Sequence, residues 1–161
     1  MAETTALEEK LGEVIGLAEA AQEAARKVEG LLGEDSRAEL LGEMASQWEE
    51  TARRAREVAE GRDGSADAVL QQAEETRQEA VEMMESYLDE DSDGLDGFEF
   101  LIMAEAGEAG HWAILGKLNE RAGEKPVGEL VEWALPVQEE HLSRVREASL
   151  ELAAAEDPEE S

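Results

Sequence analysis

The sequence predicts an all-α protein, an antiparallel four-helix bundle with one additional helix. Alanine, leucine and glutamate dominate, whereas aromatic residues make up only 4% of the chain and there are three prolines. This composition is typical of helices that pack through small side chains. At 161 residues the chain has the length of one domain. We assign residues 1–155 to the bundle and expect residues 156–161 to be a disordered acidic tail.

Two long segments at the start of the chain carry apolar residues at helical spacing. The first helix is predicted at residues 6–32, after a capping box formed by Thr5 and Glu8. The second helix is predicted after a similar Ser36 and Glu39 pair, and the glycines at 61 and 64 end it. The inward residues expected are Leu7, Leu11, Val14, Ala18, Ala21, Ala25, Val28 and Leu32 in the first helix, and Leu41, Met44, Trp48, Ala52, Ala55 and Ala59 in the second.

Three further helices are predicted in the second half of the chain. They span residues 66–88, residues 96–123, and a segment that follows the turn at 123–126 and contains Pro136. Because proline removes a backbone donor, we expect a kink at Pro136. The inward residues expected in the third helix are Val69, Ala73, Thr76, Ala80, Met83 and Tyr87.

The formal net charge of −28 restricts the partners and the location of the protein. Phosphate contact needs a basic patch, so we expect neither nucleic-acid binding nor membrane association. The start of the chain has no secretion-signal pattern and no apolar run is long enough to span a membrane, which predicts a cytoplasmic protein. With no cysteine, disulfides and thiol catalysis are excluded. The acidity and the excess of arginine over lysine are typical of proteins from salty cytoplasms, but a GC-rich genome gives the same arginine bias.

The two histidines define the candidate functional site. His111 and His141 both fall on predicted apolar faces, and Glu108 precedes His111 by three residues on the same face. This E-x-x-H spacing is the one that carboxylate-bridged di-iron and di-manganese bundles use. Glu105 at the edge of that face and Glu140 beside His141 can join the site. We therefore hypothesise an iron or manganese site formed by Glu105, Glu108, His111, Glu140 and His141.

The alternative is that both histidines are structural. In that case they hydrogen-bond to Glu108, to Gln138 or to each other across the helix pair. Gln138 stands three residues before His141, where a glutamate would be the better ligand.

An acidic loop precedes the fourth helix. Asp89, Asp91 and Asp93 match positions 1, 3 and 5 of a calcium-binding EF-hand loop, but Glu99 comes one residue before the position of the bidentate glutamate. We expect a solvated turn at a helix N-terminus rather than a calcium site.

The order of these parts resembles bacterial ferritin-like proteins of the YciF type. Residues 36–40 followed by residues 47–51 resemble the second helix of that family, and residues 109–114 resemble its fourth; the likeness covers residues 10–155. The resemblance implies a stress-associated bundle with a di-metal carboxylate site. Gln47 stands where the family has a histidine, and Gly110 where it has a glutamate.

Two functions follow as hypotheses. The first is a ferritin-like protein that binds iron or manganese and acts in stress or in metal and oxidant handling, with a ferroxidase-like oxidoreductase as the activity if there is one. The second is a non-catalytic acidic bundle that works through protein–protein contact. A homodimer is compatible with either.

Overall fold

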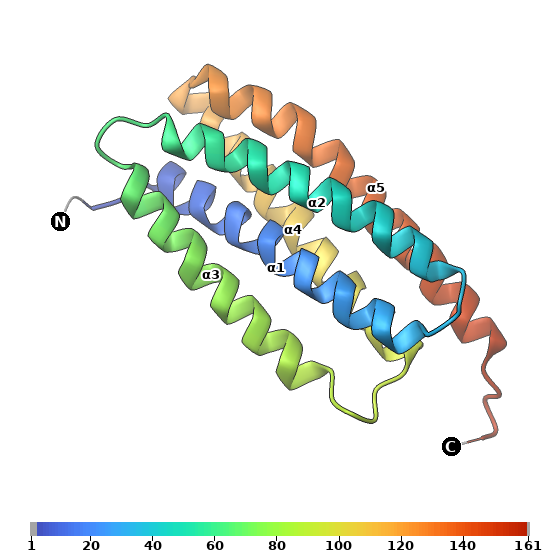
Figure 1. The fold of residues 1–161 in the computed structure, drawn as a ribbon. Coiled ribbons are helices and arrows are strands. Elements are labelled where there is room, and N and C mark those ends of the chain that lie inside the picture. The colour runs from blue at the N-terminus through green and yellow to red at the C-terminus, as the bar shows by residue number, and fades with distance from the viewer. Residues whose placement is uncertain (1–2, 161) are drawn as a thin grey trace.

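The part of the chain that the structure describes consists of five α-helices joined by short loops (Figure 1). The structure, a computed structural model, describes residues 3–160. No strand is present among these residues, so the predicted all-α class is confirmed. The helices are α1 (Ala6–Leu32), α2 (Arg37–Glu60), α3 (Ala66–Tyr87), α4 (Gly94–Ala122) and α5 (Lys125–Ala155).

The helix starts follow from capping residues. The predicted capping box at Thr5 and Glu8 is present, and each side chain binds the backbone N–H of the other residue. The predicted box at Ser36 is wrong, because the Ser36 side chain makes no cap hydrogen bond. Asp93 and Asp96 form a capping box at the start of α4, two residues earlier than the predicted start of that helix. Gly123 ends α4 in the left-handed conformation, with φ of 67°.

Four of the helices contact one another in a closed circuit. Helix α1 packs against α2 and α4, and α5 packs against both α4 and α2. Figure 1 shows that successive helices run in opposite directions, so neighbours in this circuit do so as well. Helix α3 lies outside the circuit and packs chiefly against α1, with a smaller contact to α2. The shared interior of α1, α2, α4 and α5 therefore contains the main core.

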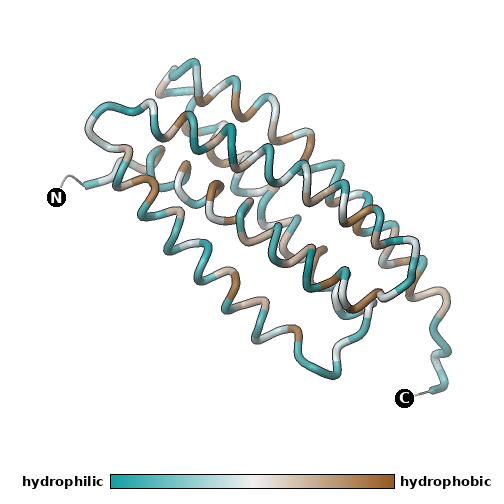
Figure 2. The backbone as a smooth tube through the Cα atoms, viewed as in Figure 1, coloured by the Kyte–Doolittle hydropathy of each residue, from teal (hydrophilic) through white to brown (hydrophobic). Residues whose placement is uncertain are grey.

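The predicted seams of α1 and α2 form this core. Every predicted inward residue of the two helices is buried except Leu32, which is partly buried. Figure 2 shows hydrophobic positions recurring at helical intervals between hydrophilic ones along each helix. Trp48 and Trp112 are fully enclosed, and the predicted inward position of Trp48 is therefore confirmed.

Helix α3 approaches α1 closely along its first half. A Cβ atom added at Gly12 would lie 2.7 Å from the Gln72 Cβ and 2.7 Å from the Val69 carbonyl oxygen. An added Cβ at Gly16 would likewise meet the backbone of Ala73. Only glycine permits this separation between the two helix backbones.

The second half of α3 corrects the prediction made for it. Met83 and Tyr87 were expected to point inward, but they are 59% and 46% exposed, and Met84 is buried in their place. The physical reason is that α3 lies outside the four-helix circuit. It has a helix to pack against on one side only, and its outer apolar residues stay uncovered.

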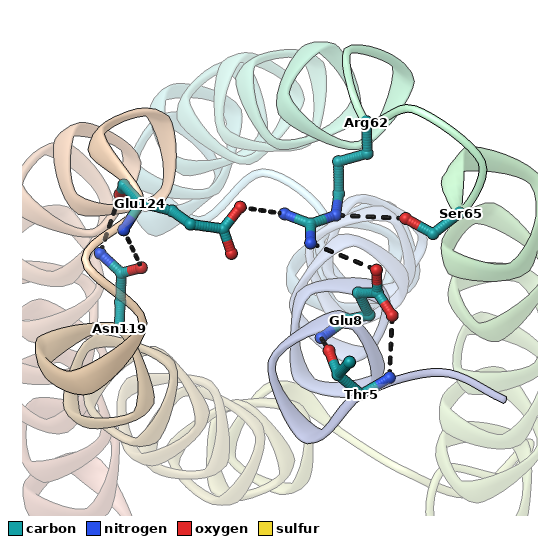
Figure 3. Close-up of polar contacts among 6 residues, drawn as sticks. All are labelled: Thr5, Glu8, Arg62, Ser65, Asn119 and Glu124. Carbon is teal, nitrogen blue, oxygen red and sulfur yellow. Dashed lines mark hydrogen bonds and ion pairs between the residues drawn. The ribbon is translucent and has the colours of Figure 1, made fainter.

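An ion-pair network ties the loops together at one end of the bundle (Figure 3). Arg62 donates hydrogen bonds to Glu124 at 2.6 Å, to Glu8 at 3.2 Å and to Ser65 at 3.3 Å. Asn119 holds the backbone of Glu124 on the other side. These contacts join the start of α1 to the α2–α3 and α4–α5 loops. No helix among the described residues is long and apolar enough to cross a membrane.

Candidate metal-binding core

A polar cluster lies in the interior between α4 and α5. Glu105 and Gln138 are 0% exposed, His141 is 1% exposed and Glu108 is 4% exposed. Glu105 and Glu108 are three residues apart on α4, and Gln138 and His141 are three apart on α5. This spacing brings both members of each pair to the same face of their helix. The cluster therefore holds two carboxyls, one amide and one imidazole away from water.

The Gln138 amide connects the two carboxyls. Its Nε2 donates a hydrogen bond to Oε2 of Glu105 at 3.1 Å and another to Oε2 of Glu108. Nε2 of His141 hydrogen-bonds to Oε1 of Gln47, which reaches in from α2. Because an amide oxygen only accepts, Nε2 of His141 carries the proton and Nδ1 carries the lone pair. That Nδ1 lies 3.7 Å from Oε2 of Glu105.

Several buried polar atoms of this cluster lack a hydrogen-bond partner within the described residues. They are Oε1 of Glu105, Oε1 of Gln138, Nδ1 of His141 and the indole Nε1 of Trp48, whose ring packs edge-on against His141 at 5.1 Å. A buried polar group without a partner costs about 1–3 kcal/mol. Three of the four atoms carry lone pairs when the carboxyls are ionised, and only the Trp48 indole is a donor. The ionised cluster therefore has a surplus of acceptors, which a proton or a cation would balance.

Burial controls the protonation of the cluster. It raises the pKa of Glu105 well above its usual range, although the Gln138 hydrogen bond acts in the opposite direction. It also raises the pKa of Glu108, and the neighbouring Glu105 charge raises it further. Burial lowers the pKa of His141 to about 4, so this imidazole is neutral at physiological pH. A neutral imidazole is the form that binds metals.

The structure brings together three of the five predicted ligands. Glu105, Glu108 and His141 meet in the core, whereas His111 and Glu140 lie elsewhere. The His111 side chain is 35% exposed, and its Nδ1 lies 3.1 Å from Nζ of Lys10 and 3.2 Å from Oε2 of Glu13. The prediction of a core position for His111 is therefore wrong, and Glu140 is exposed on the outer face of α5.

The error at His111 comes from the phase of α4. The buried residues of this helix are Leu101, Glu105, Glu108, Trp112, Leu115 and Asn119, together with three near its start. They recur at alternating steps of four and three, which turns Glu105 to the centre of the bundle and leaves His111 beside the seam. The sequence contains the same periodicity, but the pattern is complete only if the charged residue Glu105 is counted as a core residue.

Gln138 and Gln47 belong to the cluster but are absent from the predicted ligand set. The position of Gln138, three residues before His141 on the same face, is the sequence signal that marks it. Gln47 is an exposed residue, yet its Oε1 hydrogen-bonds to the buried His141. No pattern of burial marks such a residue in the sequence.

The donor set does not fit a di-metal site. Two carboxyls and one imidazole are present, and no carboxylate of α1 or α2 hydrogen-bonds within this cluster. Within residues 3–160 no group of three or more His, Cys, Asp or Glu side chains is arranged to hold a metal ion. The acidic loop is occupied by turn contacts: Asp89 accepts from the Asp91 backbone N–H, and Asp93 caps α4. The expected solvated turn at a helix N-terminus agrees with these contacts.

Comparison of the chain with protein-family models, with curated proteins and with solved structures gives no significant match.

Proposed function

We propose that this protein is a ferritin-like bundle in which Glu105, Glu108 and His141 bind a single divalent iron or manganese ion once the Gln138 amide has turned away from the two carboxyls, because these three side chains are not arranged to hold an ion as they stand. In this proposal α1, α2, α4 and α5 are the antiparallel four-helix unit, and α3 is the additional helix. The observation that carries the proposal is the surplus of unpartnered acceptor atoms in the core, on Glu105, Gln138 and His141.

Charge balance supports one divalent ion. Two ionised carboxylates in a core without a cation would be strongly disfavoured, whereas one divalent cation makes the group neutral. Two carboxylate ligands and one neutral imidazole suit Mn²⁺ and Fe²⁺. The 3.7 Å between Nδ1 of His141 and Oε2 of Glu105 is also compatible with both atoms contacting one ion, because such ligands lie about 2 Å from the metal.

Gln138 controls access to this position. Its amide nitrogen now lies between the two carboxyls and takes the place that a cation would share. A half-turn of the amide group replaces the nitrogen by Oε1, which is an acceptor. That orientation is unfavourable while both carboxyls are ionised and no cation is present, so we expect Gln138 to change its orientation on metal binding. The bound ion would supply one-electron redox chemistry, and the protein would act in metal or oxidant handling.

The test is elemental analysis of protein that has never contacted a nickel column. We expect about one iron or manganese ion per chain, and loss of this ion in Glu105→Gln and in His141→Gln. His111→Gln is the matched control, because His111 lies outside the core and the variant should keep the metal. A metal-free wild-type chain that cannot be reconstituted with Fe²⁺ or Mn²⁺, or equal retention by all three variants, would contradict the proposal.

A second candidate is a metal-free bundle that works through contact with a partner. The hydrogen bonds from Gln138 to both carboxyls favour it, because they need no ion. Here Glu105 is protonated in the fold, and its raised pKa makes the folded state less stable as the pH rises above the unfolded pKa of about 4.5. Glu105→Gln should then be more stable than the wild type at pH 8, with a smaller difference at pH 5. Thermal unfolding in chelator at the two pH values measures this.

A further inference from the structure

The His141 ring is held by α2 as well as by its own helix. Nε2 of His141 hydrogen-bonds to Oε1 of Gln47, although Gln47 is an exposed residue. The next residue, Trp48, is fully buried, and its ring packs edge-on against the same imidazole, with 5.1 Å between the ring centroids. Neither Gln47 nor Trp48 is a ligand in the proposed site. Their contacts therefore fix the orientation of the imidazole from outside the ligand set.

The hydrogen bond to Gln47 decides which ring nitrogen keeps its lone pair. A neutral imidazole carries one proton, and the Gln47 oxygen places it on Nε2 because that oxygen only accepts. The lone pair is then on Nδ1, which has no hydrogen-bond partner among the described residues and lies 3.7 Å from Oε2 of Glu105. In the other tautomer, two lone pairs would face each other at Gln47, and the proton on Nδ1 would exclude a cation. Gln47 thus selects the tautomer whose lone pair faces the carboxyls.

Gln47 makes this contact without adding a charge. Within residues 3–160, the side chains that hydrogen-bond inside the cluster are two glutamates, two glutamines and one histidine. When both carboxyls are ionised and the imidazole is neutral, one divalent cation balances the group. A trivalent cation would leave an uncompensated positive charge in the core, which is strongly disfavoured. A carboxylate in place of the Gln47 amide would supply the third negative charge.

We infer that Gln47 is a positioning residue of the proposed metal site and that its neutral amide makes the site selective for a divalent over a trivalent ion. Gln47 acts through His141, whose Nδ1 it directs towards Glu105. Hydrogen-bond partners of metal-binding histidines commonly have this role, because they fix both the tautomer and the ring orientation. The inference rests on the proposed function, since the role of Gln47 is defined towards that ion. The tautomer itself is a property of the metal-free protein and is measured separately.

The first measurement locates the proton on His141 in metal-free protein. The ¹⁵N signals of the ring nitrogens are recorded in chelator at pH 7.5, where the lowered pKa of His141 keeps its ring neutral. Because the chain has two histidines, every protein in this measurement also carries His111→Gln. We expect the proton on Nε2 when residue 47 is glutamine, and also in Gln47→Glu, because both side chains offer an acceptor oxygen. In Gln47→Leu the proton should shift towards Nδ1, because Nε2 then has no acceptor.

Gln71→Leu is the matched control for Gln47→Leu. Gln71 is exposed on α3, and its side chain hydrogen-bonds to Glu75 of the same helix. The control makes the same chemical change far from His141 in the hydrogen-bond network, so it should keep the proton on Nε2. Circular dichroism shows whether each variant is folded, and Gln47→Glu tests the same contact without an added apolar side chain.

The second measurement is metal affinity. Gln47→Leu should bind Mn²⁺ about 10–100-fold more weakly than the wild type, in titrations followed by electron paramagnetic resonance of the free ion. Gln47→Glu should retain Mn²⁺, because it keeps the acceptor. In the iron-loaded protein its added negative charge should favour Fe³⁺ over Fe²⁺ at least tenfold, which lowers the reduction potential by about 59 mV or more.

Three results would overturn the inference while leaving the proposed function intact. The first is a proton on Nδ1 of His141 when residue 47 is glutamine. The second is an unchanged tautomer together with an unchanged Mn²⁺ affinity in Gln47→Leu, which would show that Gln47 does not position the ring. The third is an equal iron potential in Gln47→Glu and the wild type, which would remove the selectivity for charge. A wild-type chain that binds neither Mn²⁺ nor Fe²⁺, although His141 has the expected tautomer, would instead contradict the proposed function and the inference with it.

Discussion

Replacing Gly16 by alanine should separate α3 from α1, although alanine is the better helix former. The added Cβ would lie 2.8 Å from the Thr76 Cβ and 2.9 Å from the Arg77 backbone nitrogen, and it would meet the Ala73 carbonyl oxygen more closely still. Two of these three atoms belong to the backbone of α3. They cannot rotate away as the end of a flexible side chain can, so the whole helix must move.

The expected magnitude combines two opposing terms. In a helix interior, alanine is favoured over glycine by about 1 kcal/mol. Overpacking costs typically about 1–3 kcal/mol, and a clash with backbone lies at the upper end of that range. The net effect of Gly16→Ala is then a loss of about 1–2 kcal/mol. For a chain of this size that lowers the melting temperature by roughly 2–8 °C.

Gly110→Ala is the control that gives the opposite sign. Its added Cβ meets no atom within 4 Å, so only the helix preference acts. We expect a gain of about 0.5–1 kcal/mol. Thermal unfolding followed by circular dichroism at 222 nm, at one fixed salt concentration, compares the two variants. A melting temperature of Gly16→Ala equal to or above that of Gly110→Ala would refute the close α1–α3 packing.

Three further predictions concern charge. Burial holds the pKa of His141 at about 4, against an ordinary value near 6.5, so the free energy of unfolding should fall by up to about 3 kcal/mol as the pH drops from 6.5 through 4. A pH series of urea unfolding in chelator should show this loss in the wild type and not in His141→Gln, whereas parallel curves would contradict it. Arg62→Met removes the contacts that Arg62 makes with Glu8 and Glu124, and it should lower the free energy of unfolding by about 1–2 kcal/mol. An unchanged urea midpoint would show that the network in Figure 3 adds no stability. Raising KCl from ~0.15 M to ~1 M shortens the screening length from about 8 Å to about 3 Å. Because the surface carboxylates of this chain of charge −28 then repel one another less, the melting temperature should rise. A flat or falling melting temperature would mean that surface repulsion is small.

The sequence was sufficient to predict where the helices lie along the chain. The bounds of α1 agree with the prediction at both ends, and its seam from Leu7 to Val28 is buried throughout. These features are local, because the spacing of apolar residues and the Thr5 capping box act within one segment. The same reasoning identified Glu108 and His141 as buried polar residues before any contact between helices was known.

The tertiary structure decided which helix lies outside the four-helix circuit. Helix α3 has an apolar stripe as regular as those of α1 and α2, so its sequence predicts burial of Met83 and Tyr87. Whether a stripe is covered depends on the number of neighbouring helices, which is a property of the whole chain. The exposure of Met83 and Tyr87 results from that arrangement.

The composition of the candidate site was decided in the same way. A rotation of α4 about its axis by less than the 100° between successive residues is enough to exchange His111 for Glu105 at the centre of the bundle. The phase is set by the packing of Trp112 and Leu115 against the other helices, where the volume that large side chains need outweighs the preference of any one polar residue. The sequence by itself determined that carboxyls and an imidazole would be buried together, and the packing of large apolar side chains determined which ones.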